Sequence, residues 1–290
     1  MAESKPKALV VDFNNLWNKY LYSRGSNFTN AIYATLYFFR DLYNSKEFQR
    51  VYIVLDGKPD KGYEIYKDYK ANRKSDPHKY IPLKVVMSVL SQYFNVVGGK
   101  KNEGDEVTAY IATRLLKNYD TYIYSNDKDF IQLMHLGVKI VKEFKQGRIT
   151  ELLTEEGALN KFKNTQGTPL KGLEYILIYR IFKGDSSDGI PSACTGMFDK
   201  IIRQMIYTHW DYPEVTEENL EEFISRVNQD TKIGKRISSD YKENLKRNWK
   251  LMDLCHTSDE LKTQVKKIHY SLDEEGLSKY NVCNKQLFYW

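Results

Sequence analysis

Short apolar runs that end in aspartate recur in the first half of the chain, with helical patterns between them. Runs of this kind are typical of strands buried on both faces of a sheet. Strands that alternate with helices form mostly parallel sheets, so their carboxyl ends, and the aspartates that follow, share one edge. The runs are Ala8–Val11 with Asp12, Val51–Leu55 with Asp56, and Thr121–Ser125 with Asp127 and Asp129. Further strands are expected over residues 95–97, 138–141 and, at an edge, 148–152, and helices over 28–43 and 82–94.

A further acidic cluster lies at the start of an expected helix. Glu103, Asp105 and Glu106 precede apolar residues from Val107 to Leu116 that are spaced as on one buried helix face. The ordinary explanation is the helix dipole, which favours acidic residues in a first turn by about 1 kcal/mol or less. An aspartate after a strand is likewise usually a cap or turn residue. Several acidic clusters at one sheet edge nevertheless favour a shared site over coincidence.

The chain changes character after about residue 156. Beyond it, apolar residues recur at helical spacing, and Pro191 and Pro213 interrupt the pattern. We therefore expect an α/β domain over residues 1–156 and a helical lobe over residues 157–290. The helices expected in the lobe cover Leu173–Phe182, Met197–Tyr207, Glu218–Val227 and Tyr241–Leu254.

Residues 60–82 form an excursion in which tyrosines alternate with basic residues. Interpreted as a helix, the segment places Lys67, Lys70 and Lys74 on one face. Such a surface can pair with phosphates and stack bases on its rings. A solvated, lysine-rich segment without a ligand explains the composition equally well. Its position directly after Asp56 favours nucleic-acid binding.

The composition excludes several classes of protein. With 290 residues, 41% of them hydrophobic, the chain can bury a substantial core. It has no apolar run near the roughly 20 residues of a membrane span, and its start lacks a signal-peptide segment. Cys194, Cys255 and Cys283 are too few and too far apart to indicate a disulfide framework or zinc site. We expect a soluble, cytoplasmic, monomeric protein that does not bind membranes.

Residues 183–191 contain the last distinctive motif. Asp185 and Asp188 follow an apolar helical pattern and could simply cap the next helix. They could also complete the acidic site at the sheet edge. Gly184 and Gly189 permit close backbone approach, and backbone groups in such a hairpin can hold a phosphate or a monovalent cation. The residues alone leave these interpretations open.

Taken in order, these motifs resemble the flap-endonuclease-type 5′ nucleases, in the phage ribonuclease H and 5′ exonuclease branch. The resemblance implies a PIN-like, 5′-nuclease-like α/β fold in which residues 60–82 form an arch or clamp and the helical lobe binds DNA. It also implies that a variant helix-hairpin-helix follows Pro191. The stretches that carry it are residues 10–12, 55–59, 69–73, 103–106, 125–133, 184–188 and 240–245.

The resemblance implies two Mg²⁺ ions, for which Mn²⁺ could substitute. Carboxylates crowded together raise each other's pKa, so a large acidic cluster needs cations. Two ions stabilise the attacking and leaving oxygens of a phosphodiester. If nine ligands are set aside from the 38 acidic residues, 29 remain against 44 basic ones, which suits a polyanionic substrate. The implied ligands are Asp12, Asp56, Glu103, Asp105, Glu106, Asp127, Asp129, Asp185 and Asp188.

The same resemblance implies roles for residues of the arch. Lys70 and Arg73 match basic residues that contact the scissile phosphate, where they stabilise developing charge. Tyr69, Lys67 and Lys74 are the implied substrate-binding residues. The implied function is a magnesium-dependent 5′-3′ exonuclease or flap endonuclease that removes RNA primers or flaps in DNA replication, encoded by a phage and acting in the host cytoplasm.

The chain departs from the family pattern in two places. Glu106 stands where many relatives have aspartate, which lengthens the ligand by one methylene. Residues 192–196 replace a glycine-rich turn, which puts potassium binding and the usual duplex contact there in doubt.

The expected partners are DNA with 5′ ends or flaps and RNA–DNA hybrids. A sliding clamp is a further partner to consider, because residues 285–290 faintly resemble a clamp-binding tail, although such a tail more often packs in a core. A single-strand-binding protein is another. Two other functions stay open: an inactive nucleic-acid-binding protein of the same fold, and a metal-dependent phosphatase. The full carboxylate set argues against the first, and the arch and helical lobe argue against the second.

Overall fold

The computed structural model of the chain describes residues 5–23, 25–72, 80–99, 101–194, 198–230, 241–255, 261 and 265–280. The chain divides into two units, and each is described by itself. The first unit comprises Met1–Lys58, Lys74–Leu153 and Thr257–Trp290, and the second comprises Pro59–Arg73 and Thr154–His256. The domain boundary predicted after residue 156 stays a prediction.

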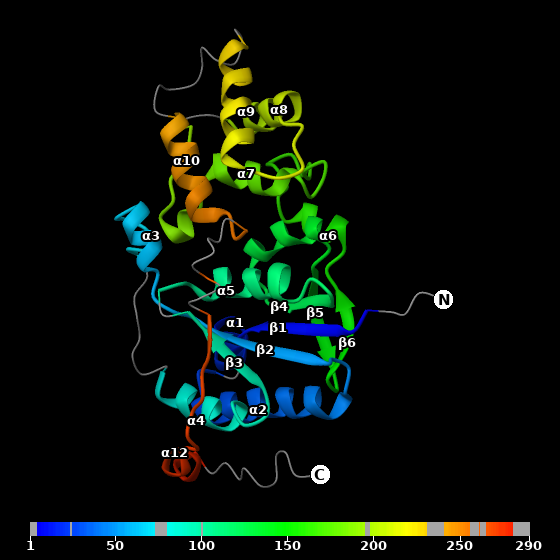
Figure 1. Cartoon of the computed structure of the whole chain (residues 1–290), viewed down its shortest axis with the longest axis vertical. Coiled ribbons are helices and arrows are strands. Elements are labelled where there is room, and N and C mark those ends of the chain that lie inside the picture. The colour runs from blue at the N-terminus through cyan, green and yellow to red at the C-terminus, as the bar shows by residue number, and fades with distance from the viewer. Residues whose placement is uncertain are drawn as a thin grey trace. The chain divides into compact units, whose positions relative to one another are not determined.

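The first unit contains a seven-stranded sheet in the order β6-β5-β4-β1-β2-β3-β7 (Figure 1). The five strands from β5 to β3 are parallel, and both edge strands are antiparallel. The mostly parallel α/β sheet predicted from the apolar runs is therefore confirmed, whereas β7 was not predicted. The strands are β1 Lys7–Asp12, β2 Arg50–Leu55, β3 Asn95–Gly98, β4 Asp120–Tyr124, β5 Lys139–Lys145, β6 Arg148–Leu152 and β7 Lys266–Lys267.

Helices cover both faces of this sheet, with α2 and α4 along one face and α5 along the other (Figure 1). The α2 side contains a hydrophobic core, where Leu9 and Val11 of β1 pack with buried aromatic rings such as Trp17 and Phe39. None of the described helices has the length and apolarity needed to cross a membrane. The helices are α1 Phe13–Ser23, α2 Phe28–Ser45, α4 Tyr80–Leu90, α5 Gly104–Tyr110, the π-helix η2 Ile111–Leu115, the 3₁₀-helix η3 Lys128–Leu136 and α12 Glu274–Lys279.

Strand register brings the predicted aspartates to one edge of the sheet. In the parallel pairs, Asp12 lies opposite Val54 of β2, and Val11 lies opposite Tyr124 of β4. The ends of β4, β1 and β2 are therefore adjacent and level. This places Asp12 between the residues that follow β2 and those that follow β4.

The helical segment that begins at Gly104 does not bury all the apolar residues that were predicted to form one face. The α-helix ends at Tyr110 and continues as the π-helix η2, in which Leu115 is 51% exposed. A π-helical turn contains an extra residue and so rotates the following side chains around the axis. The expectation that Leu115 is buried was wrong for this reason.

The second unit is helical, and the four predicted helices of the lobe are confirmed as α7 to α10. Their core includes Phe182 of α7 and Phe223 of α9, whose ring centroids lie 5.7 Å apart. The threonine N-cap of α9, Thr216, accepts a hydrogen bond from the backbone N–H of Asn219 at 3.1 Å. The helices are α3 Asp60–Ile65, α6 Glu155–Asn160, α7 Tyr175–Lys183, the 3₁₀-helix η4 Ser186–Asp188, α8 Asp199–His209, α9 Glu217–Gln229 and α10 Tyr241–Met252.

The helical interpretation of residues 67–74 was wrong for the described part of that segment. Helix α3 ends at Ile65, Tyr66 has an extended backbone, and residues 67–72 form turns. Lys70 adopts a φ of 52°, in the left-handed region that a right-handed helix excludes. Its N–H donates to the carbonyl oxygen of Asp188 at 2.8 Å, so a contact distant in sequence replaces the helical bond.

Candidate active site

Asp12 lies at the end of β1, where two donors hold its carboxylate. Oδ1 accepts from the backbone N–H of Asn15 at 3.1 Å, in the first turn of α1. Oδ2 accepts from the hydroxyl of Ser125 at 2.9 Å, at the end of β4. The side chain is therefore fixed between two neighbouring elements of the sheet edge.

Asp56 follows β2 and is held as firmly. Its Oδ1 accepts from the backbone N–H of Gly104 at 2.7 Å, and its Oδ2 accepts from the side-chain amide of Asn14 at 2.6 Å. The first bond joins the start of α5 to the end of β2. A Cβ atom on Gly104 would lie 2.7 Å from Oδ1 of Asp56, so this close approach favours glycine.

Asp127 caps the 3₁₀-helix that follows β4. Its Oδ1 accepts from the backbone N–H of Asp129 at 2.9 Å. Its own N–H donates to the hydroxyl oxygen of Ser125 at 3.1 Å, and that hydroxyl donates to Asp12. Ser125 thus links the residues after β4 to the carboxylate after β1.

The electrostatics of Asp12 reflect its burial and its acidic neighbours. Burial and, to a smaller extent, the negative charges of Asp56 and Asp127 together raise the pKa of Asp12 to about 7, against the opposing hydrogen bonds from Asn15 and Ser125. Like charges at short range disfavour ionisation of each other. The sheet edge is therefore an acidic site that favours binding of a cation.

The raised pKa of Asp12 predicts how the stability of the metal-free protein depends on pH. A carboxyl whose pKa is higher in the folded chain keeps its proton longer when folded. Its contribution to the free energy of unfolding therefore falls as the pH rises from the ordinary pKa of 3.8 to about 7. We expect a decline on the order of a few kcal/mol from this group, measured by urea unfolding in EDTA at pH 5 and pH 8. Magnesium should remove most of the decline, and stability that rises over this range would contradict the prediction.

The acidic residues of α5 begin that helix as predicted. Oε2 of Glu106 accepts from the side-chain amide of Asn102 at 3.1 Å and from the backbone N–H of Glu103 at 3.3 Å. Glu106 therefore satisfies a backbone donor at the helix start, which is a capping role. Asp105, in the same first turn, is partly exposed, as are Glu103 and Glu106.

The residues at this edge fit a hard divalent cation chemically. They offer oxygen donors, which Mg²⁺ prefers. The side-chain oxygen of Asn102 is buried and has no hydrogen-bond partner. Leaving a buried oxygen unsatisfied costs about 1–3 kcal/mol, and a cation or its bound water could satisfy it.

The acidic side chains of the described residues are not arranged as a metal-binding site. Across the described residues, no group of three or more Asp, Glu, His or Cys side chains is positioned so that it could hold an ion. Asp12 and Asp56 instead direct both of their oxygens to hydrogen-bond donors. The convergence of nine carboxylates on two ions therefore stays a prediction.

A comparison with protein families decides the family. The model of the 5′-3′ exonuclease N-terminal resolvase-like domain matches residues 7–163, more than half of the chain. The chain belongs to this exonuclease family. The 5′-3′ exonuclease of Aquifex aeolicus (strain VF5) is 31% identical to it over 170 residues, which are 56% of this chain and 54% of that protein. The chain thus spans about half the length of this curated relative.

Solved structures support the fold of this exonuclease-family chain over its whole length. The bacteriophage T5 5′-exonuclease with bound divalent zinc ions superposes with a TM-score of 0.66 and 18% identity, covering 97% of this chain and 98% of that one. The T5 D15 flap endonuclease in a pseudo-enzyme-product complex with DNA and metal ions gives a TM-score of 0.62 and 15% identity, covering 98% and 100%. These likenesses confirm the predicted 5′-nuclease-like fold.

Two of the predicted metal ligands lie in the second unit. Asp185 and Asp188 flank the 3₁₀-helix η4. Oδ2 of Asp185 lies 3.3 Å from the guanidinium of Arg180, and its Oδ1 accepts from the backbone N–H of Ser187 at 3.0 Å. Oδ2 of Asp188 lies 3.7 Å from Nζ of Lys70. Both carboxylates therefore contact basic side chains of their own unit.

The predicted arch residues differ in exposure. Tyr69 and Lys70 are buried, whereas Lys67 is exposed. Arg73 and Lys74 lie outside the described residues. So do Thr195 and Gly196 of the variant hairpin and the tail from Lys285 to Trp290. The roles predicted for these residues in the exonuclease family stay predictions.

Sequence reasoning missed the polar residues that orient the carboxylates. Asn14 and Asn15 follow Asp12 directly, and a polar pair at the start of an otherwise apolar helix was a usable signal. Ser125 offered a similar signal at the end of a strand. Asn15 also accepts from the backbone N–H of Asn126 at 3.1 Å, which ties α1 to the end of β4. The contact of Asn14 with Asp56 spans 42 residues, and those of Ser125 with Asp12 and of Asn126 with Asn15 span more than a hundred, so spacing along the chain did not reveal them.

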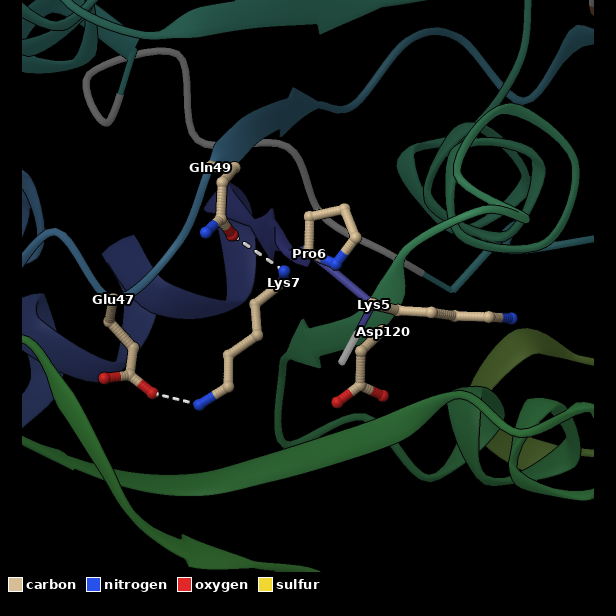
Figure 2. A pocket seen from close by; sticks show the side chains of 6 residues that line it. All are labelled: Lys5, Pro6, Lys7, Glu47, Gln49 and Asp120. Carbon is tan, nitrogen blue, oxygen red and sulfur yellow. Dashed lines mark hydrogen bonds and ion pairs between the residues drawn. The ribbon is translucent and has the colours of Figure 1, made fainter. Parts of the chain in front are cut away.

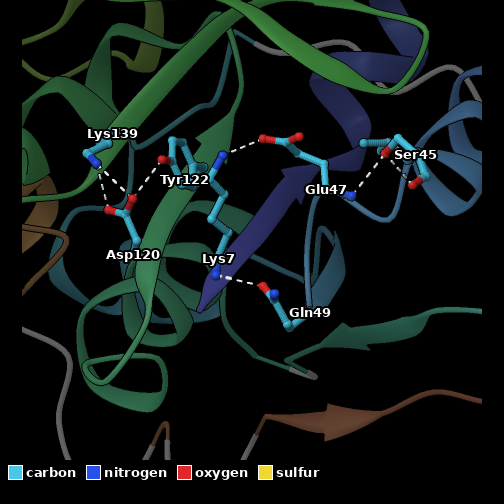
Figure 3. Close-up of polar contacts among 8 residues, drawn as sticks. Lys7, Ser45, Glu47, Gln49, Asp120, Tyr122 and Lys139 are labelled. Carbon is cyan, nitrogen blue, oxygen red and sulfur yellow. Dashed lines mark hydrogen bonds and ion pairs between the residues drawn. The ribbon is translucent and has the colours of Figure 1, made fainter. Parts of the chain in front are cut away.

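At the opposite, amino edge of the sheet, acidic side chains are paired with lysines. Asp120 begins β4 and accepts from Nζ of Lys139 at 2.7 and 2.8 Å and from the hydroxyl of Tyr122 at 2.7 Å (Figure 3). Burial raises the pKa of Asp120, but these hydrogen bonds outweigh burial and lower it below its ordinary value. The shift is opposite to that of Asp12, which distinguishes a paired carboxylate from an acidic cluster.

A pocket at the amino edge also contains matched charges (Figure 2). Nζ of Lys7 pairs with Glu47, and the backbone N–H of Lys7 donates to the side-chain oxygen of Gln49 at 2.7 Å. The hydrogen bond with Glu47 raises the pKa of Lys7. Because its charges neutralise one another, we assign this pocket no part in the chemistry of the exonuclease family. Its lining residues are Lys5, Pro6, Lys7, Glu47, Gln49 and Asp120.

Proposed function

We propose that the protein is a metal-dependent, structure-specific 5′ nuclease that hydrolyses phosphodiesters at the 5′ ends or flaps of DNA. The observation that carries the proposal is the placement of Asp12, Asp56 and Asp127 at one sheet edge, where Ser125 and Gly104 donate to or link them, in a chain of the 5′-3′ exonuclease family. The name of the Aquifex relative and the T5 complex with DNA and metal ions support it.

The chain's own residues would prepare this edge for catalysis. Asp12, Asp56 and Asp127 would hold divalent ions, which would supply charge neutralisation and an activated water for hydrolysis. The backbone N–H of Gly104 and the hydroxyl of Ser125 keep two of these carboxylates oriented. Loss of a donor that orients a metal ligand typically costs about 10- to 100-fold in metal affinity or activity.

We further propose two Mg²⁺ ions, replaceable by Mn²⁺, with the remaining predicted carboxylates completing their shells directly or through water. Lys70 and Arg73 would stabilise the scissile phosphate, and Tyr69, Lys67 and Lys74 would contact the DNA. The remaining carboxylates are Glu103, Asp105, Glu106, Asp129, Asp185 and Asp188.

The substrates we propose are flapped DNA and RNA–DNA hybrids, processed during replication in the cytoplasm. Removal of RNA primers or flaps requires cleavage near the junction of a single-stranded 5′ end with a duplex. One copy of the chain is sufficient for such cleavage, so we propose that the protein acts as a monomer. A sliding clamp or a single-strand-binding protein would be an accessory partner.

A labelled flap duplex tests the proposal. The protein is incubated with a 5′-labelled flap substrate in magnesium or in EDTA, beside Asp127→Ala. Short labelled products that require both magnesium and Asp127 are the expected result, because the removed carboxylate is one of the three at the site. The matched control is Asp120→Ala, at the other end of β4 from Asp127, which should keep its activity.

Other outcomes of this experiment identify the rival functions. Binding of the flap without cleavage in magnesium or manganese would indicate an inactive nucleic-acid-binding protein. Release of phosphate from small esters without DNA cleavage would indicate a phosphatase.

A further inference from the structure

Helix α10 carries an arginine that forms no ion pair with any described residue. Arg247 makes three hydrogen bonds, and all of them go to amide oxygens of neutral side chains. Glu243 precedes it by four residues, the usual spacing of an ion pair on a helix, and the two described side chains form no such pair. The other arginines described in the second unit all contact carboxylates; they are Arg180, Arg203 and Arg226.

Two asparagines of α10 hold the guanidinium of Arg247 in one orientation. Its Nε and Nη2 donate to Oδ1 of Asn248 at 3.1 and 2.9 Å, and its Nη1 donates to Oδ1 of Asn244 at 2.9 Å. Asn248 is fully buried, and its amide nitrogen donates to the carbonyl oxygens of Ile181 and Pro191 at 2.9 and 2.8 Å. The oxygen that accepts twice from Arg247 is therefore fixed by the end of α7 and by the hairpin after η4.

A tyrosine ring from a distant part of the chain covers Arg247. Helix α3 lies beside α10 (Figure 1), and the central carbon of the guanidinium is 4.9 Å from the ring centroid of Tyr66, the residue after α3. A guanidinium over an aromatic face is attracted to the ring electrons. Burial lowers the pKa of Arg247, but an arginine in a protein keeps its proton at neutral pH. A fixed positive charge thus lies against the predicted arch segment.

This arrangement leaves the charge and two donors of Arg247 available to a ligand. The asparagines use one N–H group each of Nε, Nη1 and Nη2. Nη1 and Nη2 each carry a second N–H group, and a fork of two such donors matches the oxygens of a phosphate. The helix also suits a polyanion, because α10 contains four basic residues and one acidic residue.

A purely structural explanation is that Arg247 fastens α10 to α3 through Tyr66. A neutral side chain could pack there without the cost of partly burying a charge that no described carboxylate balances. The cost is explained if the balancing charge comes from a ligand. The two explanations differ in what the charge of Arg247 does, and that difference can be measured.

We propose that Arg247 binds a backbone phosphate of nucleic acid, oriented by Asn244 and Asn248 and covered on one face by Tyr66. The biological role of this contact rests on the proposed nuclease function, but the contact itself requires only binding and no cleavage. A phosphate contact carries no sequence information directly. Arg247 therefore contributes affinity and register on the substrate, whatever the base sequence.

Salt-dependent binding in EDTA tests the contact without cleavage. Fluorescence anisotropy follows a labelled flap duplex with wild type and with Arg247→Gln, which keeps a polar amide but removes the charge. Each phosphate contact contributes about 0.9 to the slope of log affinity against log salt on a duplex, and about 0.7 on a single strand. The variant should lose about one contact from this slope, which corresponds to about eightfold weaker binding at about 0.1 M salt and no difference near 1 M. A plain duplex and a single strand, each bound separately, show which part of the substrate supplies the phosphate.

Three variants separate the charge from packing. Arg226→Gln in the same unit removes an arginine that is already paired with Asp211 and Glu222, and it should keep the wild-type slope and affinity. Arg247→Lys should recover the slope, since it restores the charge. Tyr66→Leu should keep the slope, because it removes the ring alone. An unchanged slope in Arg247→Gln, or an equal loss in Arg226→Gln, would overturn the proposal.

Arginine modification of the wild-type protein gives a reading that depends on no variant. Phenylglyoxal reacts with guanidinium groups, and mass spectrometry compares the rate at Arg247 with and without bound flap duplex, with Arg226 as the internal reference. Bound DNA should slow the reaction at Arg247 relative to Arg226, and an unchanged ratio would overturn the proposal. A wild type that binds the flap but never cleaves it would refute the nuclease function and leave this contact standing. Cleavage by wild type together with a wild-type slope in Arg247→Gln would refute only the contact.

Discussion

Asp12→Asn should reduce flap cleavage by about a thousandfold or more. The substitution keeps the size of the side chain but removes one of the three charges that share the sheet edge. Loss of a ligand that holds a catalytic cation costs several kcal/mol of transition-state stabilisation, and about 4 kcal/mol corresponds to a thousandfold. Single-turnover cleavage with enzyme in excess over a 5′-labelled flap measures the effect.

The same substitution should stabilise the metal-free protein at pH 8. Asp12 is ionised there against its preference, since burial and the charges of Asp56 and Asp127 raise its pKa to about 7. A neutral amide removes this cost, so urea unfolding in EDTA should show a gain on the order of 1–3 kcal/mol at pH 8 and little gain at pH 5. Asp120→Asn, which loses hydrogen bonds from Lys139 and Tyr122, should show no such gain. Reduced stability of Asp12→Asn at pH 8 would contradict the electrostatic interpretation.

Gly57→Ala should be the most destabilising single-methyl substitution near the site. A Cβ atom on Gly57 would lie 2.0 Å from the carbonyl oxygen of Gly99 and 2.3 Å from that of Asn102. Both are backbone atoms, so the chain after β3 must move to make room. Overpacking of this kind costs about 3 kcal/mol or more, measured by urea unfolding. Cleavage should also fall by about a hundredfold, because a shift of about 1 Å at the adjacent Asp56 misplaces a catalytic group.

Gly137→Ala is the matched control in the same unit. Gly137 has a φ of 85°, and nothing lies within 4 Å of the added methyl group. Its cost is therefore the backbone strain alone, about 1–2 kcal/mol, and the site should keep its activity. Similar losses of stability and activity in the two variants would show that close packing at Gly57 is not the cause.

Much of the fold follows from patterns that are local in the sequence. The apolar runs before Asp12 and Asp56 predicted parallel strands whose carboxyl ends share one edge, because strands that alternate with helices form mostly parallel sheets. The helical spacing in the second half predicted α7 to α10 correctly. The conformation of the segment after Asp56 was harder to predict. Its tyrosine and lysine spacing is compatible with a helix, but a bond from Lys70 to the distant Asp188 decided its conformation.

The sequence likewise predicted part of the candidate site but not all of it. The sequence identified aspartates that follow neighbouring strands, and the strand register and the bonds of Ser125 place Asp12 beside the residues that follow β2 and β4. It did not identify Ser125 or Asn14 as the donors that orient them. A hydroxyl or amide gains its role only from the carboxylate placed beside it by the fold.

The sequence by itself therefore determined the strands from β1 to β6, their common edge and the acidic character of that edge, because periodicity and strand connection are properties of neighbouring residues. The tertiary structure alone decided which carboxylate oxygens accept from which donors, and that Lys70 is buried against Asp188. It also decided that Asp120 pairs with Lys139, whereas burial and neighbouring negative charges raise the pKa of Asp12. The physical reason is that charge and hydrogen bonding depend on distance in space, and chain spacing constrains that distance only within a helix or strand.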